Sequence, residues 1–230
     1  MNKYALLVAS GTGTRMNQTT PKQFLNIGEK PILLHTLERF YQADHSIHII
    51  LVIAKEYIEV WKKIVKDYAI TIPHEITQGG ENRYQSVANG LAYISKKDEN
   101  EKSLIAIHDG VRPFVTKDII NKSYELAEIH GTAIPCVMPK DTVKQLVEKK
   151  VKTLDRSSIR LAQTPQTFQA TIIQQTYRQT KNSPTFTDDA SMAEAAGFPI
   201  FLFEGSYDNI KITTPEDLYI AEKLVTYQSK

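Results

Sequence analysis

The fold of this chain is decided by Tyr4-Ala5-Leu6-Leu7-Val8-Ala9-Ser10-Gly11-Thr12-Gly13-Thr14-Arg15-Met16, an apolar run that passes directly into a glycine-rich loop. The run predicts a buried strand over Tyr4–Ala9. Glycines let backbone N–H groups approach phosphate oxygens and short hydroxyl side chains add donors, so we predict a phosphate-binding loop from Ser10 to Gly13. The third glycine of a dinucleotide fingerprint is missing, and so is a G-x-x-x-x-G-K-[ST] motif, which leaves a ligand-free turn as the alternative.

Along the rest of the 230 residues, apolar runs rich in β-branched side chains alternate with segments of helical period. We predict strands at His48–Ala54, Ile70–Ile76, Ser103–His108, Thr132–Val137 and Phe198–Phe203, and helices at Ile32–Tyr41, Tyr57–Asp67, Arg83–Ser95 and Thr116–Ile129. A last helix is capped by Thr214 and opened by Pro215. This alternation predicts an α/β fold in which one domain, residues 1–230, has a mostly parallel, Rossmann-like sheet flanked by helices. Ligands bind such sheets at the carboxyl ends of the strands.

One segment departs from the alternation. Thr142–Val147 and Val151–Leu154 are two short runs that flank Glu148-Lys149-Lys150, which predicts an outlying hairpin, although its turn contains no glycine. An isolated two-stranded hairpin is marginally stable in water. We therefore expect residues 139–160 to form an arm that leans on a second subunit of a homodimer.

Composition limits the function further. Lys and Arg number 28 against 26 Asp and Glu, a balance that argues against a nucleic-acid-binding surface. The single cysteine, Cys136, excludes an intramolecular disulfide and fits a reducing compartment. The amino terminus lacks an apolar stretch long enough for a signal peptide, and no later stretch is long enough to span a membrane. We expect a cytoplasmic protein with no membrane partner.

Two cations follow the first loop: Arg15 and, seven residues later, Lys22, with Pro21 fixing the backbone before it. A nucleoside triphosphate carries about four negative charges and a phosphate nucleophile nearly two, since its second pKa is about 6. Unit charges 4 Å apart repel by about 1 kcal/mol in water and about 4 kcal/mol at a surface-like dielectric. Arg15 and Lys22 would offset this repulsion; the alternative is that both are solvated surface charges.

Two later loops carry further candidates. Gly79 and Gly80 permit a close backbone approach to a base edge, and Ser86, in the first turn of the next helix, would reach a ribose or phosphate; a plain turn with a helix cap is the alternative. In His108-Asp109-Gly110-Val111-Arg112-Pro113, Asp109 suits Mg²⁺, which binds one or two carboxylates together with substrate phosphates, and Arg112 suits a second phosphate. Alternatively, Asp109 caps a turn and pairs with Arg112, while His108 is a structural hydrogen-bonding residue.

Several phrases, taken together and in order, resemble the 2-C-methyl-D-erythritol 4-phosphate cytidylyltransferase family of the non-mevalonate isoprenoid pathway. They are Gly11-Thr12-Gly13-Thr14-Arg15-Met16, Pro21-Lys22-Gln23-Phe24-Leu25, Gly79-Gly80-Glu81-Asn82-Arg83 with Ser86-Val87, His108 to Pro113, Asp141-Thr142-Val143-Lys144, Asp155-Arg156, Gln163-Thr164-Pro165-Gln166-Thr167-Phe168, Thr187-Asp188-Asp189-Ala190-Ser191 and Asn209 to Leu218. The resemblance covers nearly the whole chain. It implies the nucleotide-diphospho-sugar transferase type of fold with a protruding β-hairpin arm.

The resemblance also implies roles. Arg15 and Lys22 would stabilise charge on the α-phosphate of CTP, and Arg156 and Lys211 would orient the incoming phosphate. Nucleotide contacts would come from Ser10, Gly11, Thr12, Gly13, Gly79, Gly80, Glu81, Arg83 and Ser86. The polyol phosphate would be held by Arg112, Thr187 and Lys211, with Asp109 near substrate and metal, and with Thr142 and Arg156 reaching over from the partner subunit. The family usually has Ala-Ala where this chain has Gly110-Val111, and commonly Ala in place of Ser10.

An already ionised phosphate needs no general base, so the expected reaction is in-line displacement of pyrophosphate, helped by Mg²⁺ and by positioned cations. The nearest alternative is a ribitol 5-phosphate cytidylyltransferase, which shares the nucleotide half. An NADP-dependent oxidoreductase would also use a glycine loop after the first strand, and a non-catalytic nucleotide-binding protein would keep the glycines without needing the later cations.

Overall fold

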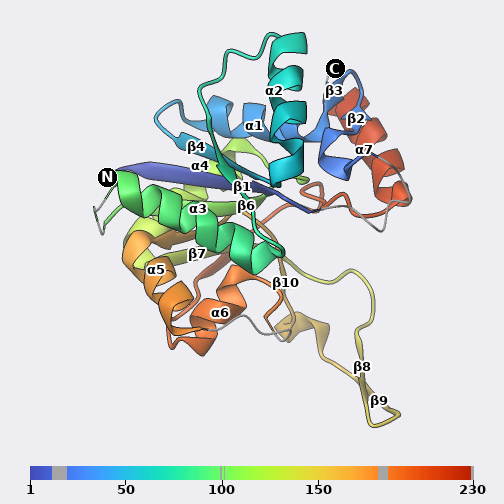
Figure 1. The fold of residues 1–230 in the computed structure, drawn as a ribbon. Helices are drawn as coiled ribbons and strands as arrows, with labels where there is room; N and C mark the ends of the chain where they lie inside the picture. The colour runs from blue at the N-terminus through green and yellow to red at the C-terminus, as the bar shows by residue number, and fades with distance from the viewer. Residues whose placement is uncertain (12–19, 99, 101, 181–185, 229–230) are drawn as a thin grey trace.

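The computed structural model describes residues 1–11, 20–98, 100, 102–180 and 186–228. Within these ranges, eight strands form one mixed, mostly parallel sheet, in the order β10-β7-β11-β6-β1-β4-β5, with β12 paired to β7. Figure 1 shows this sheet at the centre of the molecule. The strands are β1 (Lys3–Ala9), β4 (His48–Ile53), β5 (Glu75–Gln78), β6 (Leu104–Asp109), β7 (Thr132–Val137), β10 (Leu161–Ala162), β11 (Gln166–Gln169) and β12 (Leu202–Glu204). Neighbours β6, β1, β4 and β5 are all parallel, so their carboxyl ends lie at one edge.

Helices cover both faces of the sheet, as Figure 1 shows. They are α1 (Ile32–Ala43), α2 (Ile58–Asp67), α3 (Arg83–Lys97), α4 (Lys117–His130), α5 (Ala170–Gln179), α6 (Asp189–Ala195) and α7 (Pro215–Gln228). Side chains alternate along β1: Leu7 packs with α1, α2 and α4, whereas Leu6 packs with α3, α5 and α6. Because both faces are buried, the central strands read as continuous apolar runs. The predicted α/β fold is therefore correct.

Two predicted strands are shorter than expected and begin later. The run Ile70–Ile76 pairs with β4 only from Glu75 onward, and Phe198–Phe203 pairs with β7 only from Leu202. Each run contains a proline, Pro73 or Pro199, which has no N–H to donate to a ladder. The predicted helices agree with the structure to within two residues at each end, and Thr116 caps α4 by accepting a hydrogen bond from the backbone nitrogen of Ile119.

Several elements were not predicted. Strand β11 runs antiparallel between β6 and β7, and β10 runs antiparallel to β7. Helices α5 and α6 follow β11, and two short strands, β2 (Asn26–Ile27) and β3 (Lys30–Pro31), form a small hairpin against α7. A third apolar cluster, including Ile27, Ile212 and Ala221, packs this hairpin and α7 beside the loop after β6.

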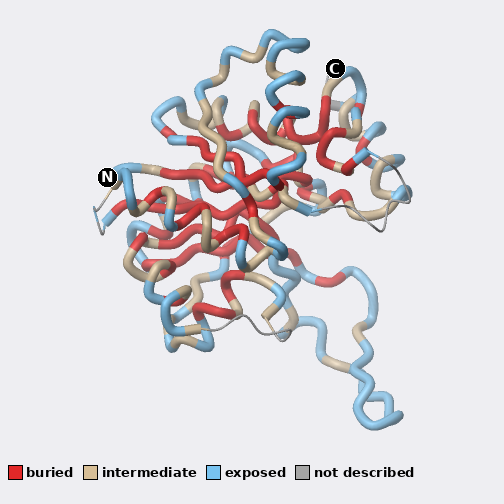
Figure 2. Tube along the Cα trace, viewed as in Figure 1, coloured by how far each residue is buried: buried red, intermediate tan, exposed pale blue. Residues whose placement is uncertain are grey.

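The predicted outlying hairpin is present as β8 (Lys144–Val147) and β9 (Lys150–Thr153). Its turn places Glu148 and Lys149 at φ of 47° and 68°, the left-handed region that two-residue hairpin turns need and that usually selects glycine or asparagine. Every residue of both strands is exposed, and Figure 2 shows the hairpin as a pale blue projection away from the buried sheet. The exposed residues include three large apolar side chains, Leu146, Val147 and Val151.

No helix in the described ranges combines the length and the apolar character that a membrane span requires.

Candidate active site

Three loops meet at the carboxyl edge of the parallel strands and enclose a cavity of about 360 Å³. Its wall includes Ser10 and Gly11 after β1, Gly80 after β5, and Asp109 at the end of β6. Lys22, Gln23, Asn82, Arg83, Val111, Lys211 and Thr213 also line it. This is the place at which the strand order predicts a ligand.

The first and second loops touch each other through two serines. Ser10 Oγ donates a hydrogen bond to Ser86 Oγ at 2.7 Å, and Ser86 Oγ accepts a second one from the Gly80 nitrogen at 3.0 Å. A β-carbon at Gly79 would lie 2.5 Å from the β-carbon of Ser10, and one at Gly80 would lie within 2.4 Å of Gln85 side-chain carbons. Any side chain at Gly79 or Gly80 would therefore clash with Ser10 or Gln85, which explains why both positions are glycine. The buried Ser86 hydroxyl therefore stabilises the Gly79–Gly80 loop through hydrogen bonds.

Lys22 is placed by a 3-10 turn, Lys22–Phe24, that is anchored on both sides. Gln23 is buried and donates its Nε2 to the carbonyl oxygen of Ala9 at 2.8 Å, which ties the turn to the end of β1. The ring of Phe24 packs against Tyr57 and Trp61, with centroid distances of 5.9 and 6.5 Å. The turn therefore presents Lys22 to the cavity from a packed base.

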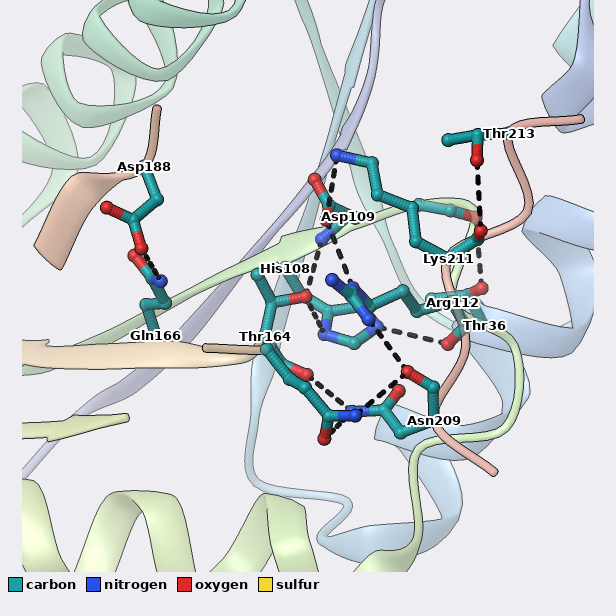
Figure 3. Close-up of polar contacts among 12 residues, drawn as sticks. Thr36, His108, Asp109, Arg112, Thr164, Gln166, Asp188, Asn209, Lys211 and Thr213 are labelled. Carbon is teal, nitrogen blue, oxygen red and sulfur yellow. Dashed lines mark hydrogen bonds and ion pairs between the residues drawn. The ribbon is translucent and has the colours of Figure 1, made fainter. Parts of the chain in front are cut away.

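Asp109 lies among three cations that come from separate segments, and Figure 3 shows two of them, Arg112 and Lys211, beside it. Its Oδ2 is 3.1 Å from Lys211 Nζ and 3.2 Å from Arg112 Nε, and its Oδ1 is 3.9 Å from Arg83 Nε. Burial on its own would raise the pKa of Asp109, but the charges of Lys211, Arg83 and Arg112 outweigh burial and hold the pKa well below its usual range. The carboxylate is ionised at neutral pH.

His108 is a structural hydrogen-bonding residue, as the second of the two sequence interpretations held. Its Nε2 is 3.2 Å from the Arg112 carbonyl oxygen, which can only accept, so Nε2 carries the proton. Its Nδ1 accepts from the Thr164 hydroxyl at 3.0 Å, and Thr164 Oγ1 accepts from the Asp109 nitrogen at 3.1 Å. Burial lowers the pKa of His108 to about 4, which keeps the ring neutral. These contacts fix the backbone on both sides of Asp109.

Arg83 lies between two carboxylates of the site, those of Asp109 and Asp189. Its Nη2 is 2.5 Å from Oδ2 of Asp189, a fully buried residue at the start of α6 whose Oδ1 accepts from the Tyr177 hydroxyl at 2.6 Å. Burial on its own would lower the pKa of Arg83, but the carboxylates of Asp189 and Asp109 raise it above its ordinary value. Arg83, the first residue of α3, is thus a permanent cation that is held against the first residue of α6, Asp189.

A second cavity, of about 350 Å³, adjoins the first. Arg83, Asp109 and Lys211 line both cavities, so they form a shared wall. The second cavity is also lined by Arg112, Arg160, Leu161, Ala162, Gln163, Thr164, Gln166, Thr187 and Asp188. Two cavities with a cationic wall in common suit two anionic molecules that must react with each other.

Lys211 owes its place to the cap of α7. Asp217 Oδ2 accepts from the backbone nitrogens of Thr213 and Thr214 and from the Thr213 hydroxyl, each at 2.8 Å. Thr214 Oγ1 accepts in return from the Asp217 nitrogen at 3.4 Å, so the predicted cap is correct. Ile212 donates its nitrogen to the Val111 carbonyl oxygen at 3.0 Å, which holds the Lys211 segment beside the loop after β6.

A model of the family described as 2-C-methyl-D-erythritol 4-phosphate cytidylyltransferase matches residues 4–227. The chain belongs to the 2-C-methyl-D-erythritol 4-phosphate cytidylyltransferase family. A Bacteroides thetaiotaomicron protein of that name is 44% identical over 225 residues, covering 98% of this chain and 100% of its own length. A Clostridium botulinum (strain Loch Maree / Type A3) protein of the same name is 42% identical over 223 residues, covering 96% of each chain.

Solved structures agree. The crystal structure of 4-diphosphocytidyl-2C-methyl-D-erythritol synthase from Anaerococcus prevotii DSM 20548 matches with a TM-score of 0.82 at 28% identity, covering 97% of this chain and 95% of that one. The Francisella tularensis 2-C-methyl-D-erythritol 4-phosphate cytidylyltransferase matches with a TM-score of 0.79 at 31% identity, covering 97% and 99%. This chain therefore has the cytidylyltransferase fold over nearly its whole length.

The structure brings together most of the residues that the family resemblance singled out. Those that line the two cavities are Ser10, Gly11, Lys22, Gly80, Arg83, Asp109, Arg112, Thr187 and Lys211. Gly79 and Ser86 support the second loop, and Glu81 is exposed beside it. Thr142 and Arg156 are exposed on the arm and line neither cavity of this chain. Thr12, Gly13 and Arg15 lie outside the described residues.

Several residues that hold the cytidylyltransferase site together were not predicted from the sequence. Gln23, Thr164, Asp189 and Asn209 each stood inside a quoted family phrase, but nothing local indicated what they contact. The backbone carbonyl oxygen of the buried Asn209 accepts a hydrogen bond from Arg112 Nη1 at 2.7 Å. One signal was available: Asp188, three residues before Ser191, has the spacing of a helix cap, and it does accept from the Ser191 nitrogen.

Asp109, the predicted magnesium ligand, would have to bind the ion without a cluster of other protein ligands from the described part of the chain. Within the described ranges, no group of three or more His, Cys, Asp or Glu residues could hold a metal ion. Both close cations contact Oδ2 of Asp109, and the Arg83 nitrogen is 3.9 Å from Oδ1, beyond hydrogen-bond distance. Oδ1 therefore keeps acceptor capacity. One free carboxylate oxygen fits Mg²⁺ that takes its remaining ligands from phosphates and water.

Proposed function

We propose that this chain transfers the cytidylyl group of CTP to 2-C-methyl-D-erythritol 4-phosphate, giving 4-diphosphocytidyl-2-C-methyl-D-erythritol and pyrophosphate. One observation carries the proposal: the cavity at the glycine loops and the cavity beside Thr187 share a wall made of Arg83, Asp109 and Lys211. CTP would occupy the first cavity and the polyol phosphate the second. Their phosphates would then meet at the shared wall.

The reaction needs positioned charge rather than a base. An ionised phosphate oxygen attacks the α-phosphorus in line, and the bond to the pyrophosphate oxygen breaks. His108 is neutral, and both its ring nitrogens are hydrogen-bonded to protein atoms, so it would not serve as a base. Lys22 and Arg15 would stabilise charge on the α-phosphate, and Lys211 and Arg112 would orient the attacking phosphate.

Mg²⁺ would be held by Asp109 together with the phosphates of CTP. When bound, the ion supplies positive charge to the phosphoryl oxygens and the leaving group. The role of the chain is to keep Asp109 ionised, which its three neighbouring cations do. Two of these cations, Arg83 and Lys211, line both cavities, so the protein and the metal would neutralise the same developing charge.

We further propose that residues 1–230 form a single nucleotidyltransferase domain and that residues 139–160 are its dimerisation arm. The exposed apolar side chains Leu146, Val147 and Val151 support this, because apolar groups gathered on an exposed projection favour a partner surface. In a homodimer, Thr142 and Arg156 would enter the second cavity of the other chain. That assignment accounts for their absence from the cavities of their own chain.

A pyrophosphate-release assay tests the function. Purified protein, CTP and Mg²⁺ should release pyrophosphate with 2-C-methyl-D-erythritol 4-phosphate and much more slowly with ribitol 5-phosphate. Lys22→Ala should lower turnover by roughly 10²–10³-fold if Lys22 is a preorganised donor. Faster release with ribitol phosphate would favour the alternative acceptor. An oxidoreductase or a non-catalytic binding protein would release none.

The dimeric site has its own test. Lys22→Ala protein and Arg156→Ala protein, each nearly inactive, should regain activity when their subunits exchange. A hybrid dimer contains one site with both defects and one with neither. No recovery after proven exchange would mean that each site is built within one chain.

A further inference from the structure

We propose that Arg160 binds the phosphate of the polyol substrate from within the same chain. This inference rests on the proposed function and adds a substrate ligand to it. Arg160 lies at the base of the arm, directly before β10, and lines the second cavity together with Arg112, Lys211 and Thr187. Arg156, four residues earlier, donates its Nη1 to the Lys140 carbonyl oxygen at 2.9 Å and lines neither cavity. Of these two arginines, Arg160 is the one in its own chain's cavity.

The guanidinium of Arg160 is anchored and still has donors to offer. Its Nη1 donates to the carbonyl oxygens of Ser157 and Ile159, each at 2.8 Å. A guanidinium has five N–H donors in a planar fork. Within the described ranges, the donors on Nε and Nη2 have no hydrogen-bond partner and no carboxylate lies in salt-bridge contact with them. An anchored fork with open donors suits bidentate binding of a phosphate.

The charges around the second cavity also favour a phosphate ligand for Arg160. The other three cations in its wall are Arg83, Arg112 and Lys211. Three carboxylates match them: Asp109 and Asp188 in the wall, and Asp189 behind it in contact with Arg83. Arg160 therefore supplies the excess positive charge of this cavity within the described residues. A phosphate monoester carries about −1.5 to −2 charges at neutral pH, so the excess charge selects a phosphorylated polyol over the free polyol.

The first experiment compares Arg160→Gln and Arg160→Lys with wild type in the pyrophosphate-release assay. Arg160→Gln should raise the KM for 2-C-methyl-D-erythritol 4-phosphate roughly 10- to 100-fold, the usual effect of losing hydrogen bonds to a charged group. The KM for CTP should stay within about twofold. Arg160→Lys keeps the charge but loses the planar fork, so it should fall between the two. The matched control is Arg178→Gln, on the exposed face of α5, which should change neither KM.

The second experiment asks which chain supplies Arg160. At low polyol phosphate, hybrids of Lys22→Ala and Arg160→Gln subunits should recover no activity, because Lys22 and Arg160 belong to the same site. Hybrids of Lys22→Ala and Arg156→Ala subunits provide the positive control. Recovery with the Arg160 variant would place Arg160 in the partner's site and overturn the proposal.

Two further results would also overturn it: an unchanged KM for the polyol phosphate in folded Arg160→Gln protein, or an equal rise in both KM values, which would indicate a structural role. In either case wild-type activity would leave the transferase function standing. No pyrophosphate release by the wild type would remove the transferase function and this inference with it.

Discussion

Replacing Asp189 with asparagine should separate the placement of Arg83 from its charge. Asp189 is fully buried and accepts two hydrogen bonds, from Arg83 Nη2 at 2.5 Å and from the Tyr177 hydroxyl at 2.6 Å. An asparagine amide has the same shape, but it offers one acceptor oxygen and one donor nitrogen. The amide oxygen can accept from Arg83 while the amide nitrogen donates to the Tyr177 hydroxyl, so both hydrogen bonds can form but the negative charge at this position is lost. Arg83 keeps its own charge and loses the negative charge that holds it in place.

The structure sets the size of the effect. Breaking a buried ion pair from one side costs about 3–5 kcal/mol of stability. Arg83 retains Asp109 at 3.9 Å, and its side chain is 28% exposed, so solvent and the second carboxylate offset part of the loss. We expect Asp189→Asn to lower the free energy of unfolding by about 2–3 kcal/mol. A catalytic group displaced by about 1 Å can cost about 10²-fold, so kcat should fall roughly 10- to 100-fold.

The assay is pyrophosphate release at saturating CTP and polyol phosphate, together with urea unfolding followed by circular dichroism. Tyr177→Phe is the control, because it removes one phenolic hydrogen bond, worth about 1 kcal/mol, and leaves the Arg83–Asp189 pair intact. Its turnover should stay within a few fold of wild type. If folded Asp189→Asn protein kept full kcat, the location of Arg83 between the two cavities would have no part in the transfer.

Three further predictions follow from the described contacts. Gly79→Ala should raise the KM for CTP at least several-fold, because its β-carbon would lie 2.5 Å from that of Ser10; an unchanged KM would show that the loop can shift freely. Burial lowers the pKa of His108 from 6.5 to about 4, so the contribution of the neutral ring to the free energy of unfolding is complete above pH 6.5 and falls by about 3 kcal/mol as the pH drops to 4. The free energy of unfolding, measured by urea titration, should therefore change less between pH 6.5 and pH 4 in His108→Phe than in wild type. An equal change in both proteins would contradict this prediction. Charged substitutions at Leu146 and Val151 should shift the protein toward monomer in analytical ultracentrifugation, without lowering the midpoint of urea unfolding of the isolated chain.

The parallel half of the sheet was predictable from local sequence. Strands β1, β4 and β6 are each six or seven residues long and buried on both faces, so each reads as an apolar run that ends in loop residues. The run Ile70–Ile76 contains three isoleucines, yet only its end joins the sheet. Hydrophobicity marked the segment, whereas Pro73 decided which part could form a ladder.

The antiparallel half was not predictable in this way. Strand β11 has one large apolar side chain, Phe168, and its buried polar residues depend on distant partners. Gln166 contacts the Asp188 carboxylate and the Ala190 nitrogen, and Thr167 donates to the Ser123 hydroxyl at 2.9 Å. Helix α6 is only seven residues long and starts at these contacts. No periodicity within a short window encodes hydrogen bonds of this kind.

In the candidate site, too, the locally encoded features were predictable and the contacts between distant residues were not. The loops were found because parallel strands must present their carboxyl ends together, and the glycines marked the places where backbone had to approach closely. The Asp109–Arg112 pair, three residues apart, was foreseen as an alternative, whereas the Arg83–Asp189 pair was missed, since these residues are 106 positions apart. Arg83 was therefore predicted as a nucleotide contact alone, whereas its geometry makes it part of both cavities.

A buried carboxylate at the centre of an anion-binding site serves a physical purpose. If neither Asp109 nor a substrate phosphate were present, Arg83, Arg112 and Lys211 would repel one another in a region of low dielectric. The segments that carry these cations come from different parts of the chain. Asp109 lets these cations assemble before any phosphate arrives, at the cost of competing with the phosphate afterwards. Preorganised charge accelerates a reaction more than charge that must gather during it. The competition would be limited, because both close contacts use Oδ2 and the cavities proposed for the two substrates both extend from the shared wall.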